Sequence, residues 1–152
     1  MKVSQIMRQP AVVIHEDTSL EEAARIMLER KLRGLPVVDQ QGKLCGFLSV
    51  SDYFAKNKYI PFSRFHAPQL FGKWISSEGI EQMYQEERNT PVKQIMSMNV
   101  VSVTEDDSVD NVVRLMLDRH LNRIPVVRDG VPVGVIARYD LLQLMVQKSK
   151  PE

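Results

Sequence analysis

The sequence has few of the features that carry catalysis or metal binding. Its 152 residues include three histidines, His15, His66 and His120, and no two of them have the spacing of metal ligands. The single cysteine, Cys45, excludes an internal disulfide, and its apolar neighbours predict a small core residue. There is no glycine-rich phosphate loop and no nucleophile motif. These absences argue against an enzyme and against a metal site.

Long hydrophobic runs and charge of one sign are also missing. The longest apolar runs are a few residues, so no segment is expected to span a bilayer. The 20 basic and 19 acidic residues leave a net charge of +1, which gives no electrostatic reason to expect nucleic acid or an anionic membrane as partner. Residues 1–8 lack the apolar core of a signal peptide. We therefore expect a cytoplasmic protein.

What the sequence does contain is a repeat. The stretch Leu32–Asp52 returns as Leu121–Asp140, with an offset of 89 before the hairpin turn and 88 after it. The first copy has one extra residue in that turn, and turns tolerate such length changes. The chain divides into a first repeat (1–54), an insert (55–90) and a second repeat (91–152). Each repeat is too short to hold a sizeable core alone, so we expect the two to pack together.

Each repeat is expected to form a strand, a helix, two further strands and a last helix. A short buried strand is predicted over 11–14, and Thr18 or Ser19 has capping-box spacing for the helix that follows. Two β-branched runs, 35–38 and 124–127, each precede a turn and a second run, which predicts hairpins. A continuous helical stripe predicts the core-facing residues Leu20, Ala23, Ala24, Met27 and Leu28, and in the second repeat Val109, Val112, Val113, Met116 and Leu117.

The insert is rich in aromatic residues. Eight of the ten aromatic side chains lie between Tyr53 and Tyr84, which is not typical of a flexible linker. Pro61 and Pro68 predict turns in its first half, and 77–89 is expected to be helical. Two interpretations stay open: a lid over the repeat core, or a docking surface for a protein partner.

Both hairpins end in a pattern that suits the binding of a sugar. A glycine-containing strand is followed by Ser49 and Asp52 in the first repeat, and by Ala137 and Asp140 in the second. A carboxylate in this position can accept hydrogen bonds from a ribose diol, and a nearby helix N-terminus favours phosphate. The alternative is that Asp52 and Asp140 only cap the helices that follow, which aspartate does well.

The paired Leu-Pro-Val-Val and Ile-Pro-Val-Val segments, each followed by Gly-x-x-x-x-x-Asp, resemble a tandem of cystathionine-β-synthase-type (CBS) domains, called a Bateman module. The resemblance covers both repeats and not the insert. It implies an α/β (α+β) fold of two β-α-β-β-α repeats, with two sheets packed face to face around a pseudo-two-fold axis. It also implies a flat homodimer, and clefts between the repeats that bind AMP, ADP, ATP or S-adenosylmethionine, with no required cofactor.

The resemblance also implies which residues bind the ligand. Ser49, Asp52 and Asp140 match the family's hydroxyl and ribose-binding carboxylates, whereas Ala137 departs from the pattern because it has no hydroxyl. Arginines near the second motif are expected to reach a phosphate, and the first repeat differs there, so we expect unequal sites. The residues in question are Arg123 and Arg138, matched by Gly34 and Val50, with Arg33 next to Gly34. The adenine is expected against the strand entries, at Pro10, Ala11, Val12, Asn99 and Val100.

These observations predict a stand-alone regulatory module that binds an adenosine-containing ligand and signals to an unidentified protein partner. The alternative is a protein-interaction adaptor that uses the aromatic insert, with vestigial nucleotide sites. The chain resembles plant chloroplast members of the family in having a tryptophan-containing insert, and their regulation of thioredoxins supports this alternative.

Overall fold

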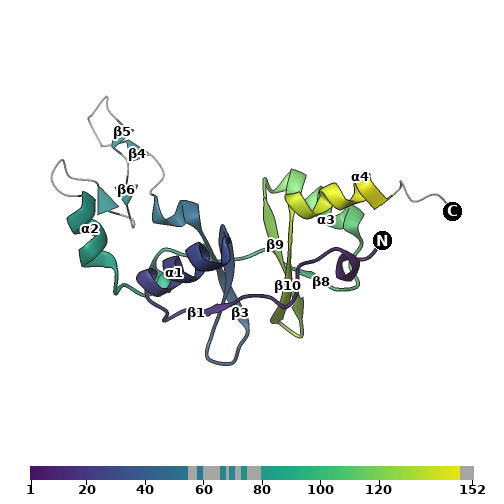
Figure 1. Ribbon diagram of the computed structural model, residues 1–152, viewed down its shortest axis with the longest axis horizontal. Helices are drawn as coiled ribbons and strands as arrows, with labels where there is room; N and C mark the ends of the chain where they lie inside the picture. Colours follow the sequence, from purple (N-terminus) through teal and green to yellow (C-terminus); the bar gives the residue numbers. More distant parts are fainter. Residues whose placement is uncertain (55–57, 60–65, 68, 71–72, 75–79, 148–152) are drawn as a thin grey trace.

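In the computed structural model, the described residues are 1–54, 58–59, 66–67, 69–70, 73–74 and 80–147. Two three-stranded sheets lie at the centre, and each has the helix of its own repeat on its outer side (Figure 1). The first repeat contains β1 (Ile14–His15), α1 (Leu20–Arg30), β2 (Gly34–Val38), β3 (Leu44–Ser49) and the 3₁₀ helix η2 (Val50–Tyr53). The second contains β8 (Val103–Thr104), α3 (Val109–Asp118), β9 (Arg123–Arg128), β10 (Val131–Ala137), the 3₁₀ helix η4 (Arg138–Leu142) and α4 (Gln143–Gln147). The predicted mixed α/β fold of two repeats is confirmed.

The two sheets have the same topology. Their strand orders are β1-β2-β3 and β8-β9-β10, with the first pair parallel and the second antiparallel in each. The β9–β10 turn is the two residues Asp129 and Gly130, both with positive φ, at 53° and 80°. This is the hairpin geometry that Asp-Gly favours, so the turn prediction is confirmed there.

The first strand is shorter than the sequence predicted, and its counterpart in the second repeat has the same length. The strand expected over 11–14 is observed only at Ile14–His15, where Ile14 pairs with Val37. In the second repeat Val103 likewise pairs with Val126. Each pairing begins one residue after a proline of the central strand, Pro36 or Pro125, which has no N–H to extend the ladder. The chain before β1 is therefore free to leave the sheet.

Serine caps start both central helices. The hydroxyl of Ser19 accepts a hydrogen bond from the backbone N–H of Glu22 at 3.1 Å, and Ser108 does the same for Asn111 at 3.1 Å. The apolar stripe is narrower than predicted, because Leu28 is 80% exposed and Leu117 is 61% exposed. Each lies one position after a buried methionine, and about 100° of helical rotation turns it away from the sheet.

Each repeat completes its core with the segment that opens the other repeat. The 3₁₀ helix η1 (Val3–Gln5) and the residues after it pack into the core of the second repeat, where Val3, Ile6 and Met7 are buried. The 3₁₀ helix η3 (Val92–Gln94) and Met96 complete the core of the first repeat in the same way. Backbone hydrogen bonds fix the exchange, since Arg8 pairs with Val135 and Ser97 pairs with Phe47. The two repeats therefore form one folding unit.

The insert is only partly described. Its short strands are β4 (Lys58–Tyr59), β5 (His66–Ala67), β6 (Gln69–Leu70) and β7 (Lys73–Trp74), which pair as β4–β5 and β6–β7. The helix expected over 77–89 is observed as α2 (Ile80–Glu87), and Tyr84 packs against the core of the first repeat. The turns predicted at Pro61 and Pro68, and the aromatic residues Phe62, Phe65 and Phe71, lie outside the described residues. Among the helices described, none has the length and apolar character needed to cross a membrane.

Candidate functional site

A cleft of about 460 Å³ lies between the two repeats. One wall is the segment Pro10–Val12, which leaves the sheet before β1, together with the start of β2 at Gly34. The other wall comes from the second repeat and includes Val135, Ala137 and Tyr139. The volume lies within the range of small-molecule sites. Six of the residues predicted to bind ligand are brought together here: Pro10, Ala11, Val12, Arg33, Gly34 and Arg123.

The lining of the cleft is strongly basic. Arg8, Lys31, Arg33 and Arg123 contribute side chains, and no aspartate or glutamate lies among the lining residues. Burial, and then the charges of Arg33 and Arg8, lower the pKa of Arg123 from its ordinary value. Within the described part of the chain, neither Arg33 nor Arg123 makes an ion pair. An anion in the cleft would therefore meet two guanidinium groups, those of Arg33 and Arg123, that are not neutralised by an ion pair.

The two predicted carboxylates close the same turn in both repeats. Asp52 Oδ2 accepts from the backbone N–H of Ser49 at 2.8 Å, and Asp140 Oδ2 accepts from the backbone N–H of Ala137 at 2.8 Å. The sequence left open that these aspartates are N-caps, but the N-caps are Ser49 and Ala137, and each aspartate binds back to its N-cap from the third helical position. This bond occupies only one of the two oxygens of Asp140.

The second oxygen of Asp140 binds an arginine from the start of the chain. Arg8 Nε lies 2.8 Å from Asp140 Oδ1, and the side chains are 57% and 2% exposed respectively. A carboxylate this deeply buried needs a partner to offset the loss of its hydration, and Arg8 supplies it. The guanidinium also lies over the ring of Tyr139, 5.8 Å from its centroid.

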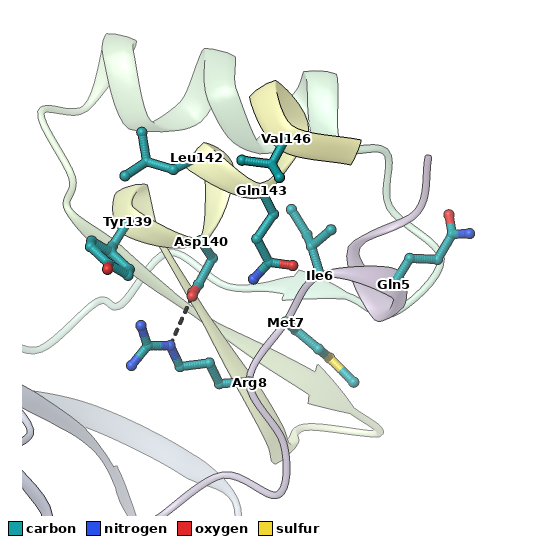
Figure 2. A pocket seen from close by; sticks show the side chains of 9 residues that line it. All are labelled: Gln5, Ile6, Met7, Arg8, Tyr139, Asp140, Leu142, Gln143 and Val146. Atoms are coloured by element: carbon teal, nitrogen blue, oxygen red, sulfur yellow. Dashed lines mark hydrogen bonds and ion pairs between the residues drawn. The ribbon is translucent and has the colours of Figure 1, made fainter. Parts of the chain in front are cut away.

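Arg8 and Tyr139 separate the cleft from a second cavity. This cavity has a volume of about 540 Å³ and is lined by Asp140 and by residues of η1, η4 and α4. Figure 2 shows Arg8 reaching from the N-terminal segment to Asp140, with Tyr139 beside the pair. Because Arg8 and Tyr139 line both cavities, a movement of Arg8 would connect Asp140 with the basic cleft.

The remaining predicted residues do not line the basic cleft. Asn99 and Val100 follow Ser97, which pairs with Phe47 of β3, so their segment enters beside the strand that ends at Ser49. The sequence did not say how strand entries and carboxylates combine. The exchange of segments sets which strand entry lies near which carboxylate, because each entry segment runs along the hairpin of the other repeat. Ser49 and Asp52 thus belong with Asn99 and Val100, and Asp140 belongs with Pro10, Ala11 and Val12.

The side chain of Arg138 binds the protein backbone and does not line the cleft. Its guanidinium donates to the carbonyl oxygens of Leu121 at 2.8 Å and Met116 at 3.0 Å, near the C-terminal end of α3. These contacts favour a structural role, and the phosphate contact expected of Arg138 stays a prediction. Arg8, Lys31 and Tyr139 line the cleft and were not among the predicted residues. Comparison of the two repeats could have identified two of them, because Arg8 and Tyr139 replace the serines found at the equivalent positions of the other copy, Ser97 and Ser51.

Comparison with known proteins gives a consistent family. The family model described as "CBS domain" matches residues 3–56 and 92–147. Protein MJ1426 of Methanocaldococcus jannaschii is 28% identical over an alignment of 158 positions that covers 96% of this chain and 92% of that protein. The chloroplastic protein CBSX2 of Arabidopsis thaliana is 25% identical over 144 residues, covering 92% of this chain and 60% of that protein.

Solved structures share the fold. The CBS domain pair of protein MJ0100, in complex with 5′-methylthioadenosine and S-adenosyl-L-methionine, has a TM-score of 0.70 and 25% identity, with 98% of each chain covered. The structure of CBSX2 in complex with AMP has a TM-score of 0.70 at 21% identity, also with 98% of each chain covered.

Proposed function

This chain belongs to the CBS domain family, with one CBS domain in each repeat, and on that premise we propose that it is a regulatory module that binds an adenosine-containing ligand between its repeats. The observation that carries the proposal is the basic cleft. An apolar wall at Pro10–Val12 stands close to Arg33 and Arg123 in a space of about 460 Å³. An adenosine ligand needs this combination of an apolar surface and polar anchors.

Each part of the ligand has a counterpart in the cleft or directly beside it. The adenine rests against Pro10–Val12, where apolar contact and the backbone of an irregular segment are available. The ribose hydroxyls bind Asp140, which lies in the neighbouring cavity and is reached from the cleft when Arg8 moves away from its Oδ1 atom. An acidic group of the ligand meets Arg33 and Arg123. AMP, ADP, ATP and S-adenosylmethionine all share the adenosine part of this arrangement.

Binding would be signalled through the relative position of the repeats. The ligand contacts both repeats, and the exchanged segment 1–9 joins its site to the core of the second repeat. A ligand shifts such an equilibrium only by its different affinities for the two arrangements. The ligand is therefore a signal rather than a cofactor, and a protein partner reads the arrangement that it stabilises.

The proposed module is a homodimer. Leu28 and Leu117 occupy equivalent positions on α1 and α3, and both are largely exposed. Exposed leucines on two repeat-related helices suit a contact with a second copy of the chain. Sedimentation equilibrium at micromolar concentration should give a dimer, and a Leu28→Lys, Leu117→Lys double variant should give a monomer. A monomeric wild type would overturn the dimer proposal.

Thermal unfolding of the purified protein tests the ligand proposal. The panel contains AMP, ADP, ATP and S-adenosylmethionine, with GMP and GTP as controls. A ligand at about a hundred times its dissociation constant adds roughly 2.7 kcal/mol to the free energy of unfolding, which raises the midpoint by several degrees. A shift with an adenine ligand and none with guanine ligands is expected. No shift with any adenosine compound would contradict the proposal.

Two further measurements bear on the details. An Asp52→Ala, Asp140→Ala double variant should lose affinity for the adenosine ligand, and retained affinity would overturn the ribose assignment. Chromatography of the bound nucleotide after prolonged incubation should return it unchanged. Steady conversion to a product would show an enzyme instead of a sensor.

A further inference from the structure

Arg8 marks the main chemical difference between the two exchanged segments. The offset of 89 aligns Arg8 with Ser97, and the backbones at the two positions make the same contacts. Arg8 exchanges backbone hydrogen bonds of 2.9 and 3.0 Å with Val135, and Ser97 exchanges bonds of 3.0 and 2.9 Å with Phe47. A serine therefore suffices for this backbone position. The arginine needs an explanation from its side chain.

The side chain of Arg8 occupies the carboxylate that we assign to the ribose. Its Nε donates to Asp140 Oδ1 at 2.8 Å, and the other oxygen, Oδ2, holds the N–H of Ala137. A ribose diol that binds Asp140 must share or displace this bond. At 57% exposure, the Arg8 side chain has room to leave, whereas Asp140 is buried. Binding of the ribose therefore releases a cation at the edge of the cleft.

The released cation would join an existing cluster of positive charge. Lys31, Arg33 and Arg123 already line the cleft without an acidic residue among its lining residues. Arg8, Arg33 and Arg123 line the same cleft, so their positive charges repel one another, and the pKa of Arg123 is lowered by burial and then by Arg33 and Arg8. Adenosine or 5′-methylthioadenosine would leave this repulsion uncompensated. S-adenosylmethionine carries a carboxylate, but its sulfonium and ammonium groups leave it with a net positive charge, so it would not lower the positive charge of the cleft.

We propose that Arg8 makes this site selective for adenosine phosphates, by exchanging its ion pair with Asp140 for a phosphate group when the ribose binds Asp140. The proposal rests on the proposed function and adds the ligand class and the residue that selects it. When the ribose binds Asp140, Arg8 loses its carboxylate partner. The phosphate group replaces that partner and also bridges Arg8 with Arg33 and Arg123. Adenosine and 5′-methylthioadenosine have no anionic group for Arg8, and the single carboxylate of S-adenosylmethionine is outweighed by its two positive charges.

Isothermal titration of the wild-type chain with AMP, adenosine, 5′-methylthioadenosine and S-adenosylmethionine is the first test. AMP should bind at least about tenfold more tightly than the other three, and its affinity alone should fall steeply between low and high NaCl concentration. S-adenosylmethionine or adenosine binding as tightly as AMP would overturn the selectivity and leave the proposed function intact. Absence of binding by all four would overturn both.

An Arg8→Ser variant, which introduces the residue of the other repeat, tests the role of the side chain. AMP should lose about tenfold or more in affinity, while adenosine should bind equally or better because nothing competes for Asp140. Arg114→Ser, an exposed arginine on α3, is the matched control and should change neither affinity. Equal weakening of AMP and adenosine in the Arg8→Ser variant would show that Arg8 is only structural.

The comparison does not depend on the stability of one variant. Arg8→Lys retains the charge but not the planar guanidinium, and it should keep the preference for AMP with reduced affinity. If Arg8→Ser does not fold, the ratio of AMP to adenosine affinity in Arg8→Lys and the salt dependence of the wild type decide the matter. The proposal would be overturned if Arg8→Lys bound AMP and adenosine equally well and if salt did not weaken AMP binding to the wild type.

Discussion

Arg8 and Asp140 lie 132 positions apart in the chain, and their side chains form an ion pair of 2.8 Å between Nε and Oδ1. The pair joins the segment that opens the first repeat to the turn that closes the last hairpin of the second repeat. It lies at the wall between the inter-repeat cleft and the neighbouring cavity. The same contact thus serves the assembly of the two repeats and the chemistry of the candidate site.

The Arg8–Asp140 pair should contribute measurably to stability. Hydrogen bonds to charged groups contribute about 1.5–3 kcal/mol, and solvent screening of the partly exposed Arg8 reduces the value below this range. Urea unfolding of Arg8→Ser, Asp140→Asn and the double variant should give a coupling free energy of about 1 kcal/mol. Additive effects would mean that the two side chains act independently. Asp118→Asn, at an exposed position of α3, is the control and should change stability by less than about 0.5 kcal/mol.

The exchanged segment should stabilise the repeat on which it packs. Ile6 is 3% exposed and belongs to the core of the second repeat, so Ile6→Ala should cost about 2–5 kcal/mol of unfolding free energy. Hydrogen exchange should rise more in β8, β9 and β10 than in β1, β2 and β3. A larger rise of hydrogen exchange in β1, β2 and β3 would contradict the packing of the N-terminal segment on the second repeat. Met98→Ala, at 67% exposure, should leave the exchange pattern unchanged.

The equivalent strand glycines Gly46 of β3 and Gly134 of β10 should differ in their tolerance of a methyl group. A Cβ at Gly134 would lie 2.7 Å from the carbonyl oxygen of Arg8, a backbone atom that cannot move without shifting the exchanged segment. At Gly46 a Cβ would approach only the flexible side chain of Met96. Gly134→Ala should therefore lower the free energy of unfolding by about 1–3 kcal/mol, and Gly46→Ala by less. Urea midpoints in the reverse order would show that the segment adapts more easily than Met96.

Cys45 should react slowly with alkylating reagents. Burial, and then the hydrogen bond to the Glu16 carboxylate, raise the pKa of the Cys45 thiol to about 11. A pKa about two units above the ordinary value leaves roughly a hundredfold less thiolate at pH 8, and the thiolate is the reactive form. Alkylation by iodoacetamide, followed by mass spectrometry, should be correspondingly slower in the folded protein than in urea. Glu16→Gln should accelerate the folded-state reaction, and an unchanged rate would exclude an influence of Glu16.

Much of the local structure could be predicted because it depends on neighbouring residues. Ser19 and Ser108 cap helices through hydrogen bonds that span three positions, and Asp129-Gly130 closes its hairpin by its own backbone preference. The repeat and its family then placed these elements in a known order. The shortening of the strand expected over 11–14 was missed because the effect of Pro36 depends on which strand lies beside it.

The sequence alone determined the repeat, the order of elements and the types of residue available for a site. Only the tertiary structure decided that Asp140 faces Arg8, that Pro10–Val12 joins Arg33 and Arg123, and that Leu28 and Leu117 point outward. The physical reason is the range of the interactions. Caps and turns are settled within a few residues, whereas these contacts exist because two segments are exchanged between repeats, and the exchange depends on how two incomplete cores bury their apolar surface together.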